Sequence, residues 1–194
     1  MPKKINKLIP MEDLIVKYMS KYISLSDDEV KIITKQNLIR RYKKNEVLLS
    51  EGEQATECYL VLSGCIRAYY LIEGEERNAD FYIENDTITS ISYQAQLPSQ
   101  YYLSCIEDSI VAVSSDARNK KLIAQIPKLS FLIMQINQER LIQKTVEFDN
   151  FKNCNPEQRY LELIEKKPDL TKRIPLFHLA SYLGITQVYL SRNP

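Results

Sequence analysis

Residues 176–192 read LFHLASYLGITQVYLSR, and this stretch predicts two short helices around a tight turn. In the first helix, Phe177, Leu179, Ala180 and Leu183 are apolar residues at helical spacing. Gly184 then supplies the left-handed backbone conformation that ends many helices. The first half of the stretch is therefore expected to bury one apolar face and to stop at its glycine.

The second helix is expected to begin directly after the turn. Ile185 fills the apolar position of the turn, and the Thr186 hydroxyl is placed to cap the helix that follows. Val188 and Leu190 are the candidate inward positions of that helix. A helix, a glycine-containing turn and a second helix form the pattern of helix-turn-helix DNA readers. Spacing alone fits any other helical hairpin equally well.

Length and charge limit the kind of protein. A chain of 194 residues fits one large or two small domains, and 44% hydrophobic residues can supply a core. Residues 151–194 carry seven Lys and Arg against four acidic residues, whereas residues 1–150 carry 19 against 21. A mildly basic end on a mildly acidic body suits phosphate contact at that end, although chance scatter of surface charge gives the same pattern.

Targeting and metal-binding signals are weak. No apolar run approaches the ~18 residues of a membrane span, and lysines interrupt the N-terminus where a signal peptide would be apolar. We therefore expect a cytoplasmic protein without membrane contact. The cysteines are dispersed and are expected to be reduced thiols: Cys58, Cys65, Cys105 and Cys154. His178 is the only histidine, so neither a metal site nor a cofactor is expected.

The chain opens with two predicted helices and then turns to strands. Residues 11–22 have helical periodicity, and Ser26 with Glu29 forms a capping box at the start of a second helix. From about residue 38 to residue 113 the sequence is rich in β-branched and aromatic runs. The expected strands are 47–50, 58–62, 65–72, 79–83, 101–106 and 109–113. Three glycines lie in the turns between them and are expected at positive φ: Gly52, Gly64 and Gly74. Strands of this spacing predict a compact antiparallel roll.

Helical periodicity returns after the strands. A short helix is expected near 116–125, and a longer one over about 127–149. Its apolar residues lie on more than one face: Leu129, Leu132, Ile133 and Ile136 form one stripe, and Met134, Leu141 and Phe148 recur at intervals of seven. Such a helix packs on the roll with one face and on a twin helix with another. A single helix buried inside one domain is the alternative.

A break at 150–156 separates this part from the end of the chain. Asn155, Pro156 and Gln158 form a strong helix start, with an Asn cap, a proline at the first helical position and a reciprocal Gln. Tyr160, Leu161 and Ile164 are the expected buried face of that helix, and Lys166-Lys167-Pro168 stops it. We place a domain boundary near residue 150.

Four segments, in this order of elements, resemble the Crp/Fnr family of catabolite-activator-type transcription regulators. They are VLLSEGE at 47–53, CYLVLSGCIRAYY at 58–70, NPEQRYLEL at 155–163 and IPLFHLASYLGITQVYLSR at 174–192, and the resemblance spans about residues 10–192. It implies an α+β fold. A cyclic-nucleotide-binding-like sensor domain would occupy residues 1–149, ending in a long dimerisation helix at about 127–149. A helix-turn-helix DNA-binding domain would occupy residues 150–194.

The resemblance implies a non-enzymatic homodimer that senses a small effector and binds palindromic promoter DNA, with RNA polymerase as a further partner. Carried over by position, the base-reading residues fall on Gln187, Val188 and Arg192, and phosphate or groove-edge contacts on Thr186, Tyr189 and Ser191. Tyr189 serves equally well as a packing residue. Gln suits adenine and Arg suits guanine, whereas Val offers only apolar contact, for example to a thymine methyl group.

The chain departs from the cyclic-nucleotide-binding members of the family. Thr89-Ser90 stands where they carry Gly-Glu, Ser99-Gln100 stands where they carry Arg followed by a small hydroxyl residue, and residues 86–103 contain neither Lys nor Arg. A buried phosphate without a cation is costly, so we expect no binding of cyclic AMP or cyclic GMP. Any effector pocket is expected at Thr89, Ser90, Ser99 and Gln100. Tyr93, Tyr101 and Tyr102 either line such a pocket or are half-buried strand residues.

Two further departures concern cofactors and the recognition helix. The dispersed cysteines, and a histidine that lies outside the roll, argue against an iron–sulfur cluster or haem. Asn193 and Pro194 follow Arg192, where the family's recognition helix usually continues. We therefore expect a shortened recognition helix, either because the chain is naturally shorter or because this sequence is an incomplete version of a longer one. A dimeric ligand-sensing or interaction module with impaired DNA binding is therefore the alternative function. A metal-dependent enzyme of cupin type is disfavoured, because residues 1–177 contain no histidine.

Overall fold

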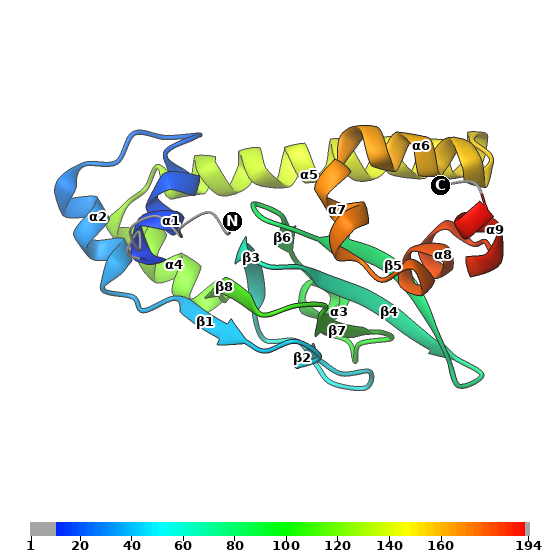
Figure 1. The fold of residues 1–194 in the computed structure, drawn as a ribbon. Coiled ribbons are helices and arrows are strands. Elements are labelled where there is room, and N and C mark those ends of the chain that lie inside the picture. The colour runs from blue at the N-terminus through cyan, green and yellow to red at the C-terminus, as the bar shows by residue number, and fades with distance from the viewer. Residues whose placement is uncertain (1–10, 193–194) are drawn as a thin grey trace, which may run out of the picture.

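The computed structural model describes residues 11–192 and has an α+β fold. A long helix, α5 (Leu129–Asn153), runs along one side of a β-roll (Figure 1). Three helices gather at one end of the roll: α1 (Met11–Met19), α2 (Asp27–Thr34) and α4 (Asp116–Gln125). Four shorter helices lie at the other end: α6 (Pro156–Lys166), α7 (Pro168–Arg173), α8 (Leu176–Leu183) and α9 (Gln187–Arg192).

The roll consists of two four-stranded antiparallel sheets. Sheet A has the order β1-β8-β3-β6, and sheet B has the order β2-β7-β4-β5. The strands of sheet A are β1 (Ile39–Tyr42), β8 (Ser109–Ser114), β3 (Cys58–Ser63) and β6 (Thr87–Ile88). Those of sheet B are β2 (Val47–Leu49), β7 (Tyr102–Cys105), β4 (Ile66–Ile72) and β5 (Glu75–Tyr82), and the short helix α3 (Ile91–Ala95) links β6 to β7. The predicted roll is confirmed, but β1 and β6 were not among the predicted strands.

The glycine-marked turns have the predicted backbone conformation. Gly52, Gly64 and Gly74 have φ values of +83°, +103° and +83°. Glu73 also has a positive φ, so the β4–β5 hairpin turns through two left-handed residues, as two-residue hairpins prefer. At Gly64 a Cβ atom would lie 2.3 Å from Oγ of Ser109, so this turn also requires close backbone approach.

The interior of the roll is filled by its own side chains. Buried residues such as Val61, Ile66 and Leu103 form its centre. Aromatic rings of both sheets pack with them: Tyr42, Tyr59, Tyr70 and Tyr82. Tyr93 of α3 and Tyr101, just before β7, add two more rings. The rings of Tyr70 and Tyr101 meet edge to face, with centroids 5.7 Å apart. The space between the two sheets is therefore occupied by protein.

A second core joins the outer face of sheet A to the helices. Ile15, Ile33, Leu122 and Leu132 come from four different helices and pack around Leu60 and Ala112 of sheet A. Ser26 and Glu29 form the predicted capping box of α2. Helix α1 ends at Met19 and not at residue 22 as expected, although Tyr22 still packs against this core.

Helix α5 is longer than predicted, because it continues through Asn153 and ends at Cys154. The break expected at 150–156 is therefore confined to about two residues. One face of α5 is buried through Leu129 and Leu132. Its remaining surface exposes large apolar side chains: Phe131, Met134, Leu141, Ile142, Val146, Phe148 and Phe151.

The C-terminal helices share a third core with the roll. Leu170, Leu179 and Leu183 are buried there beside Phe81 of β5. Helix α6 starts with the predicted capping box of Asn155 and Gln158. The expected buried face of α6 is partly wrong, because Leu161 is exposed and Leu163 packs inward instead. Helix α7 was not predicted, since Pro168 was interpreted only as a helix stop and not as the first residue of a new helix.

Candidate functional site

Helices α8 and α9 form the predicted helix-turn-helix. Gly184 ends α8 with a φ of +71°, and the Ile185 amide donates to the Ala180 carbonyl across the turn. Ile185 is partly buried against the third core. The Tyr189 amide donates to Oγ1 of Thr186 at 3.2 Å, so Thr186 caps α9 as expected. Gly184 therefore ends α8 and Thr186 caps α9, as their residue types predicted.

The face of α9 that points outward carries most of the predicted DNA-contacting residues. Thr186, Gln187, Val188, Tyr189 and Ser191 are all exposed. Leu190 is 2% exposed and anchors the helix, as expected. The inward expectation for Val188 is wrong, because its side chain is 57% exposed and shares the outward face. The side chain of Arg192 lies outside the described residues.

Phe177 also differs from its expected inward position. Its side chain is 53% exposed and lies against the His178 ring. Leu179, Ala180 and Leu183 alone form the buried stripe of α8. Only Leu190 anchors α9 with comparable burial.

Helix α8 lies against β5 and is held there by polar contacts. The His178 ring accepts at Nδ1 from the Arg67 guanidinium at 3.1 Å and from the Asn78 side-chain amide at 3.2 Å. The Asn78 backbone amide donates to Oγ of Ser181 at 3.0 Å, and that hydroxyl donates to the Glu76 carbonyl. The first helix of the helix-turn-helix is thus bound to the β4–β5 hairpin of the roll.

The electrostatics of this contact favour neutral His178. Burial, followed by the neighbouring Arg67 charge, lowers the pKa of its imidazole to about 4, although Glu76 opposes both. Arg67 also donates to Glu76 at 2.6 Å and packs over the Tyr69 ring. Because Arg67 can only donate, Nδ1 of His178 must be the acceptor.

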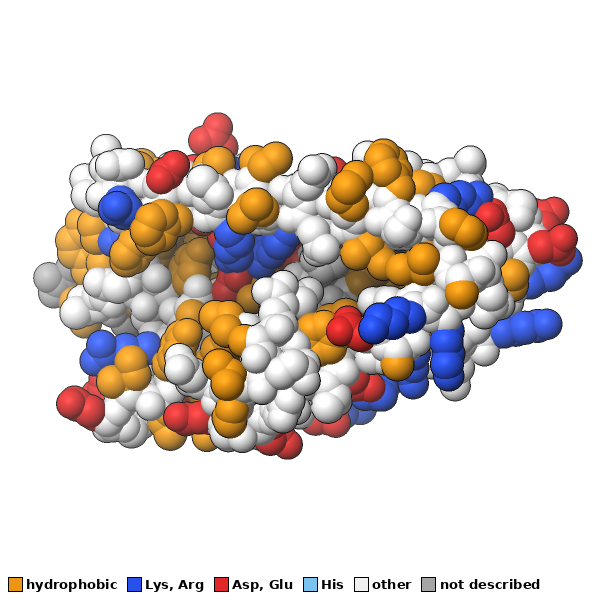
Figure 2. Space-filling view, turned by 180° about the vertical axis from the view of Figure 1, so that it is seen from behind, with side chains coloured by type: hydrophobic (Ala, Val, Ile, Leu, Met, Phe, Trp, Pro, Cys, Tyr) orange, Lys and Arg blue, Asp and Glu red, His pale blue; other side chains and the backbone are white. Residues whose placement is uncertain are grey.

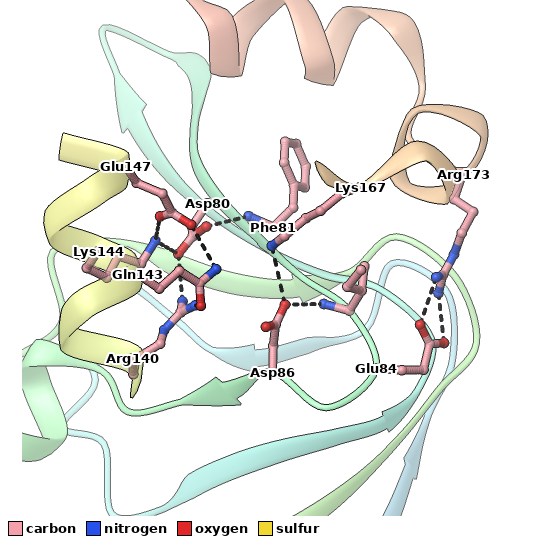
Figure 3. A network of polar contacts seen from close by, with 11 residues as sticks. Asp80, Phe81, Glu84, Asp86, Arg140, Gln143, Lys144, Glu147, Lys167 and Arg173 are labelled. Carbon is pink, nitrogen blue, oxygen red and sulfur yellow. Dashed lines mark hydrogen bonds and ion pairs between the residues drawn. The ribbon is translucent and has the colours of Figure 1, made fainter. Parts of the chain in front are cut away.

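Ion pairs hold α7 to the roll next to this contact. Arg173 pairs with Glu84 at 2.8 Å (Figure 3). Its Nε also donates to Glu107 at 3.0 Å. Lys167, at the start of α7, lies 3.6 Å from Asp86. Burial raises the pKa of Glu84, but hydrogen bonds from Arg173 and from the Gly64 amide outweigh it and leave that pKa below its usual range.

A second ionic cluster joins β5 to the middle of α5. Asp80 is 8% exposed and accepts from Arg140 at 3.1 Å and from Lys144 at 2.6 Å (Figure 3). Lys144 also pairs with Glu147 at 2.6 Å. Figure 2 shows the face beneath α5, where basic and acidic side chains gather and the surface is hollowed on both sides of them.

The residues predicted for an effector pocket do not converge on one cavity. Thr89 lines a cavity outside the roll, together with Tyr93. The Ser90 hydroxyl accepts from the Tyr93 amide and so caps α3. Ser99 is buried, and its hydroxyl donates to the Tyr101 carbonyl, while Gln100 is exposed. The hydroxyl groups of Ser90 and Ser99 are therefore used within the fold.

The tyrosines of this region have separate surroundings. Tyr101 belongs to the roll interior, and Tyr102 stacks on Tyr69 with ring centroids 5.1 Å apart. All four cysteines are unpaired, as expected, and burial raises the pKa of Cys65 to about 12 and of Cys105 to about 11. Among the described residues, no group of His, Cys, Asp and Glu side chains is arranged to hold a metal ion. No described helix is long and apolar enough to cross a membrane.

Sequence reasoning missed the residues that connect the roll to the helix-turn-helix. His178 meets Arg67 and Asn78, which lie 111 and 100 positions before it in the sequence. Arg173 likewise reaches two glutamates that lie far from it in the chain. Residue type alone could have indicated these contacts. His178 and Arg173 lie in or next to the helix-turn-helix, and a polar side chain that is partly buried there requires a hydrogen-bonding partner.

Comparison with known proteins agrees with this architecture. Residues 39–125 match the cyclic nucleotide-binding domain family, which is a family of binding domains and not of enzymes. FixK2 from Bradyrhizobium japonicum is 16% identical, with 80% of this chain and 81% of that chain covered and a TM-score of 0.60. The catabolite activator protein of Thermus thermophilus is 18% identical, with 89% and 83% covered and a TM-score of 0.51.

A CooA variant from Carboxydothermus hydrogenoformans is 16% identical, with 80% of this chain and 73% of that chain covered and a TM-score of 0.62. Comparison with functionally curated proteins gave no match. The structural neighbours thus share with this chain a β-roll, a long helix and C-terminal helices. At these identities the likeness establishes the fold.

Proposed function

We propose that this chain, which has the fold of the Crp/Fnr regulators, is a transcription regulator that binds palindromic promoter DNA as a homodimer. The outward face of α9 carries the proposal. Gln187, Val188 and Ser191 are exposed on it while Leu190 anchors the helix from behind. A helix held in this way can enter a major groove and present its side chains to base edges.

The chemistry of this face favours base reading. The Gln187 amide has the donor and acceptor pair that matches adenine, and Val188 suits a thymine methyl group. Arg192 is assigned to guanine by its position in the motif. Thr186 and Ser191 offer hydroxyl groups for the phosphate backbone.

The exposed surface of α5 supports the homodimer. Met134, Leu141 and Phe148 recur at intervals of seven and are 47%, 68% and 59% exposed. Such a stripe on a helix of 25 residues suits pairing with the same helix of a second copy. Two related recognition helices must lie about 34 Å apart to enter successive major grooves. Because the two copies of a homodimer are related by a twofold axis, the DNA site that they bind is expected to be palindromic.

Cyclic AMP and cyclic GMP are not the proposed effectors. Tyrosine rings occupy the space between the sheets. The buried guanidinium of Arg67 is paired with Glu76, and that of Arg140 is paired with Asp80. A cyclic phosphate bound between the sheets would lack an unpaired cation and would have to displace aromatic side chains.

The test is a gel-shift titration on a duplex selected from a random-sequence palindromic pool. Gln187→Ala is expected to weaken binding by about 5- to 150-fold, the loss of one bidentate base contact. Arg192→Ala is expected to act similarly, and affinity is expected to fall steeply with salt. Gln125→Ala, which changes an exposed glutamine of α4, should leave binding unchanged.

Docking of α8 on the roll favours one second candidate. The contacts of His178 and Ser181 with the β4–β5 hairpin hold the motif against the sensor domain. A dimeric sensing or interaction module with impaired DNA binding would retain this contact in all states. Selection that enriches no duplex, from a protein shown to be dimeric, would support that candidate against the regulator.

A further inference from the structure

A cavity of about 800 Å³ lies on the outer face of sheet A and not inside the roll. The alternation of side chains along the strands places it there. Leu60 of β3, Ala112 of β8 and Thr87 of β6 line the cavity. Their sequence neighbours Val61, Val111 and Ile88 point the other way, into the roll core. Successive strand residues face opposite sides of a sheet, so most of the cavity lies outside the roll. Its rim reaches the margin of the roll core at Tyr59 and Val113.

The cavity has an apolar floor and a polar mouth. Leu60, Ala112, Leu122, Leu129 and Leu132 are buried and form the floor. Exposed polar side chains line the cavity as well: Thr89, Gln94, Gln96, Asp116 and Asn137. Helices α1, α3, α4 and α5 all contribute to its wall. The volume is in the range of sites that hold small organic ligands.

The charge of the lining limits what can bind. Asp116 is the charged residue among the side chains that line the cavity, and the Tyr93 hydroxyl donates to its carboxylate at 2.7 Å. Neither Lys nor Arg lines the cavity within the described part of the chain. An anionic group at the mouth would meet a carboxylate without a compensating cation. A neutral donor or a cation would instead be stabilised there.

We propose that this cavity binds a small amphipathic molecule, with an apolar body on the floor formed by Leu60 and Ala112 and a neutral or cationic head at Asp116. Binding of this molecule does not depend on DNA binding. Its regulatory use does rest on the proposed function: Leu129, Leu132 and Ile136 of α5 line the cavity, so an occupant contacts the helix assigned to dimerisation.

Two fluorescent probes that differ by one charged group test the proposal on the full chain. N-phenyl-1-naphthylamine is neutral, and 1-anilinonaphthalene-8-sulfonate has the same rings with a sulfonate. The neutral probe is expected to bind saturably, with one probe per protomer. The sulfonate is expected to bind at least about tenfold more weakly, because it meets Asp116. Equal binding of the two probes would contradict the assigned head group.

Three variants locate the probe. Ala117→Trp fills the mouth from an exposed position of α4 and is expected to abolish binding, whereas Lys120→Trp places the same ring elsewhere on α4 and should not. Asp116→Lys is expected to reverse the preference toward the sulfonate, which also shows that the variant is folded. Probe binding that ignores all three changes, or that occurs only after removal of residues 1–10, would overturn the proposal. Gel shifts without probe test the DNA function separately.

Discussion

The two sheets of the roll are covered on their outer faces by different kinds of contact. Sheet A is covered by α1, α2, α4 and α5 through a continuous apolar core. The contact with the C-terminal helices has a smaller apolar centre, formed by side chains such as Phe81 and Leu179. Charged and polar groups hold its edges: Arg67, Asn78, Lys167, Arg173 and His178.

This difference indicates which part of the molecule can move. Separating the helices from sheet A would expose a large apolar surface to water, which is costly. Ion pairs and hydrogen bonds at an edge exchange with water at a small net cost. Both contacts bury apolar side chains. Because more of the contact of α7 and α8 is polar, we expect it to open at a lower cost than the cover of sheet A.

The largest expected effect comes from the apolar cover of sheet A. Leu132 is 2% exposed at the centre of the contact between α5 and sheet A. Leu132→Ala is expected to lower the free energy of unfolding by about 2–5 kcal/mol, because it removes buried methyl groups and leaves a cavity. Urea denaturation followed by circular dichroism measures the change.

The matched control is the same substitution at an exposed helical leucine. Leu161 of α6 is 58% exposed, so Leu161→Ala should change the free energy of unfolding by less than about 0.5 kcal/mol. Comparable losses in the two variants would mean that α5 does not pack on sheet A as described.

The elements that define the fold could be predicted because their signals are local. Ser26 with Glu29 and Asn155 with Gln158 form capping boxes within four residues. The turn glycines have positive φ because the chain reverses direction between the strands that flank them. The two residues of β6 carry too little periodicity to be predicted, and α7 escaped prediction because Pro168 was interpreted only as a helix stop.

The candidate site was predicted less completely, because it depends on contacts distant in sequence. Val188 and Phe177 were expected to point inward from helical spacing, yet a short helix with few packing partners leaves both exposed. The contact between His178 and Arg67 could not be predicted, because the sequence around each residue contains no information about the other. Which face of α8 meets the roll is decided by tertiary packing.

A smaller effect is expected at the charged edge of the contact with α7. Arg173→Ala removes the partner of Glu84 and Glu107 and is expected to weaken docking by about 1–3 kcal/mol. Hydrogen exchange should then accelerate in α7 and α8 while the strands of sheet A keep their protection. The control is Lys172→Ala, which changes the neighbouring residue, whose side chain is 76% exposed. It should change neither the docking free energy nor the hydrogen exchange of α7 and α8. Uniform acceleration across both regions would show that Arg173 stabilises the whole chain and not this edge.

The smallest effect is a pH dependence confined to the same contact. The pKa of His178 falls from its usual 6.5 to about 4 through burial and the Arg67 charge, so its neutral form is favoured in the docked state. The free α8 takes up a proton first, and docking is therefore full above pH 6.5 and weakens as the pH falls toward 4. Arg67 holds the pKa of Glu76 below its usual range, so that carboxylate does not titrate in the upper part of this window. Hydrogen exchange of α8 should accelerate between pH 6.5 and pH 5, after correction for the intrinsic rate. His178→Asn keeps an acceptor but cannot titrate, so it should remove the dependence, and its persistence would assign the effect to another group.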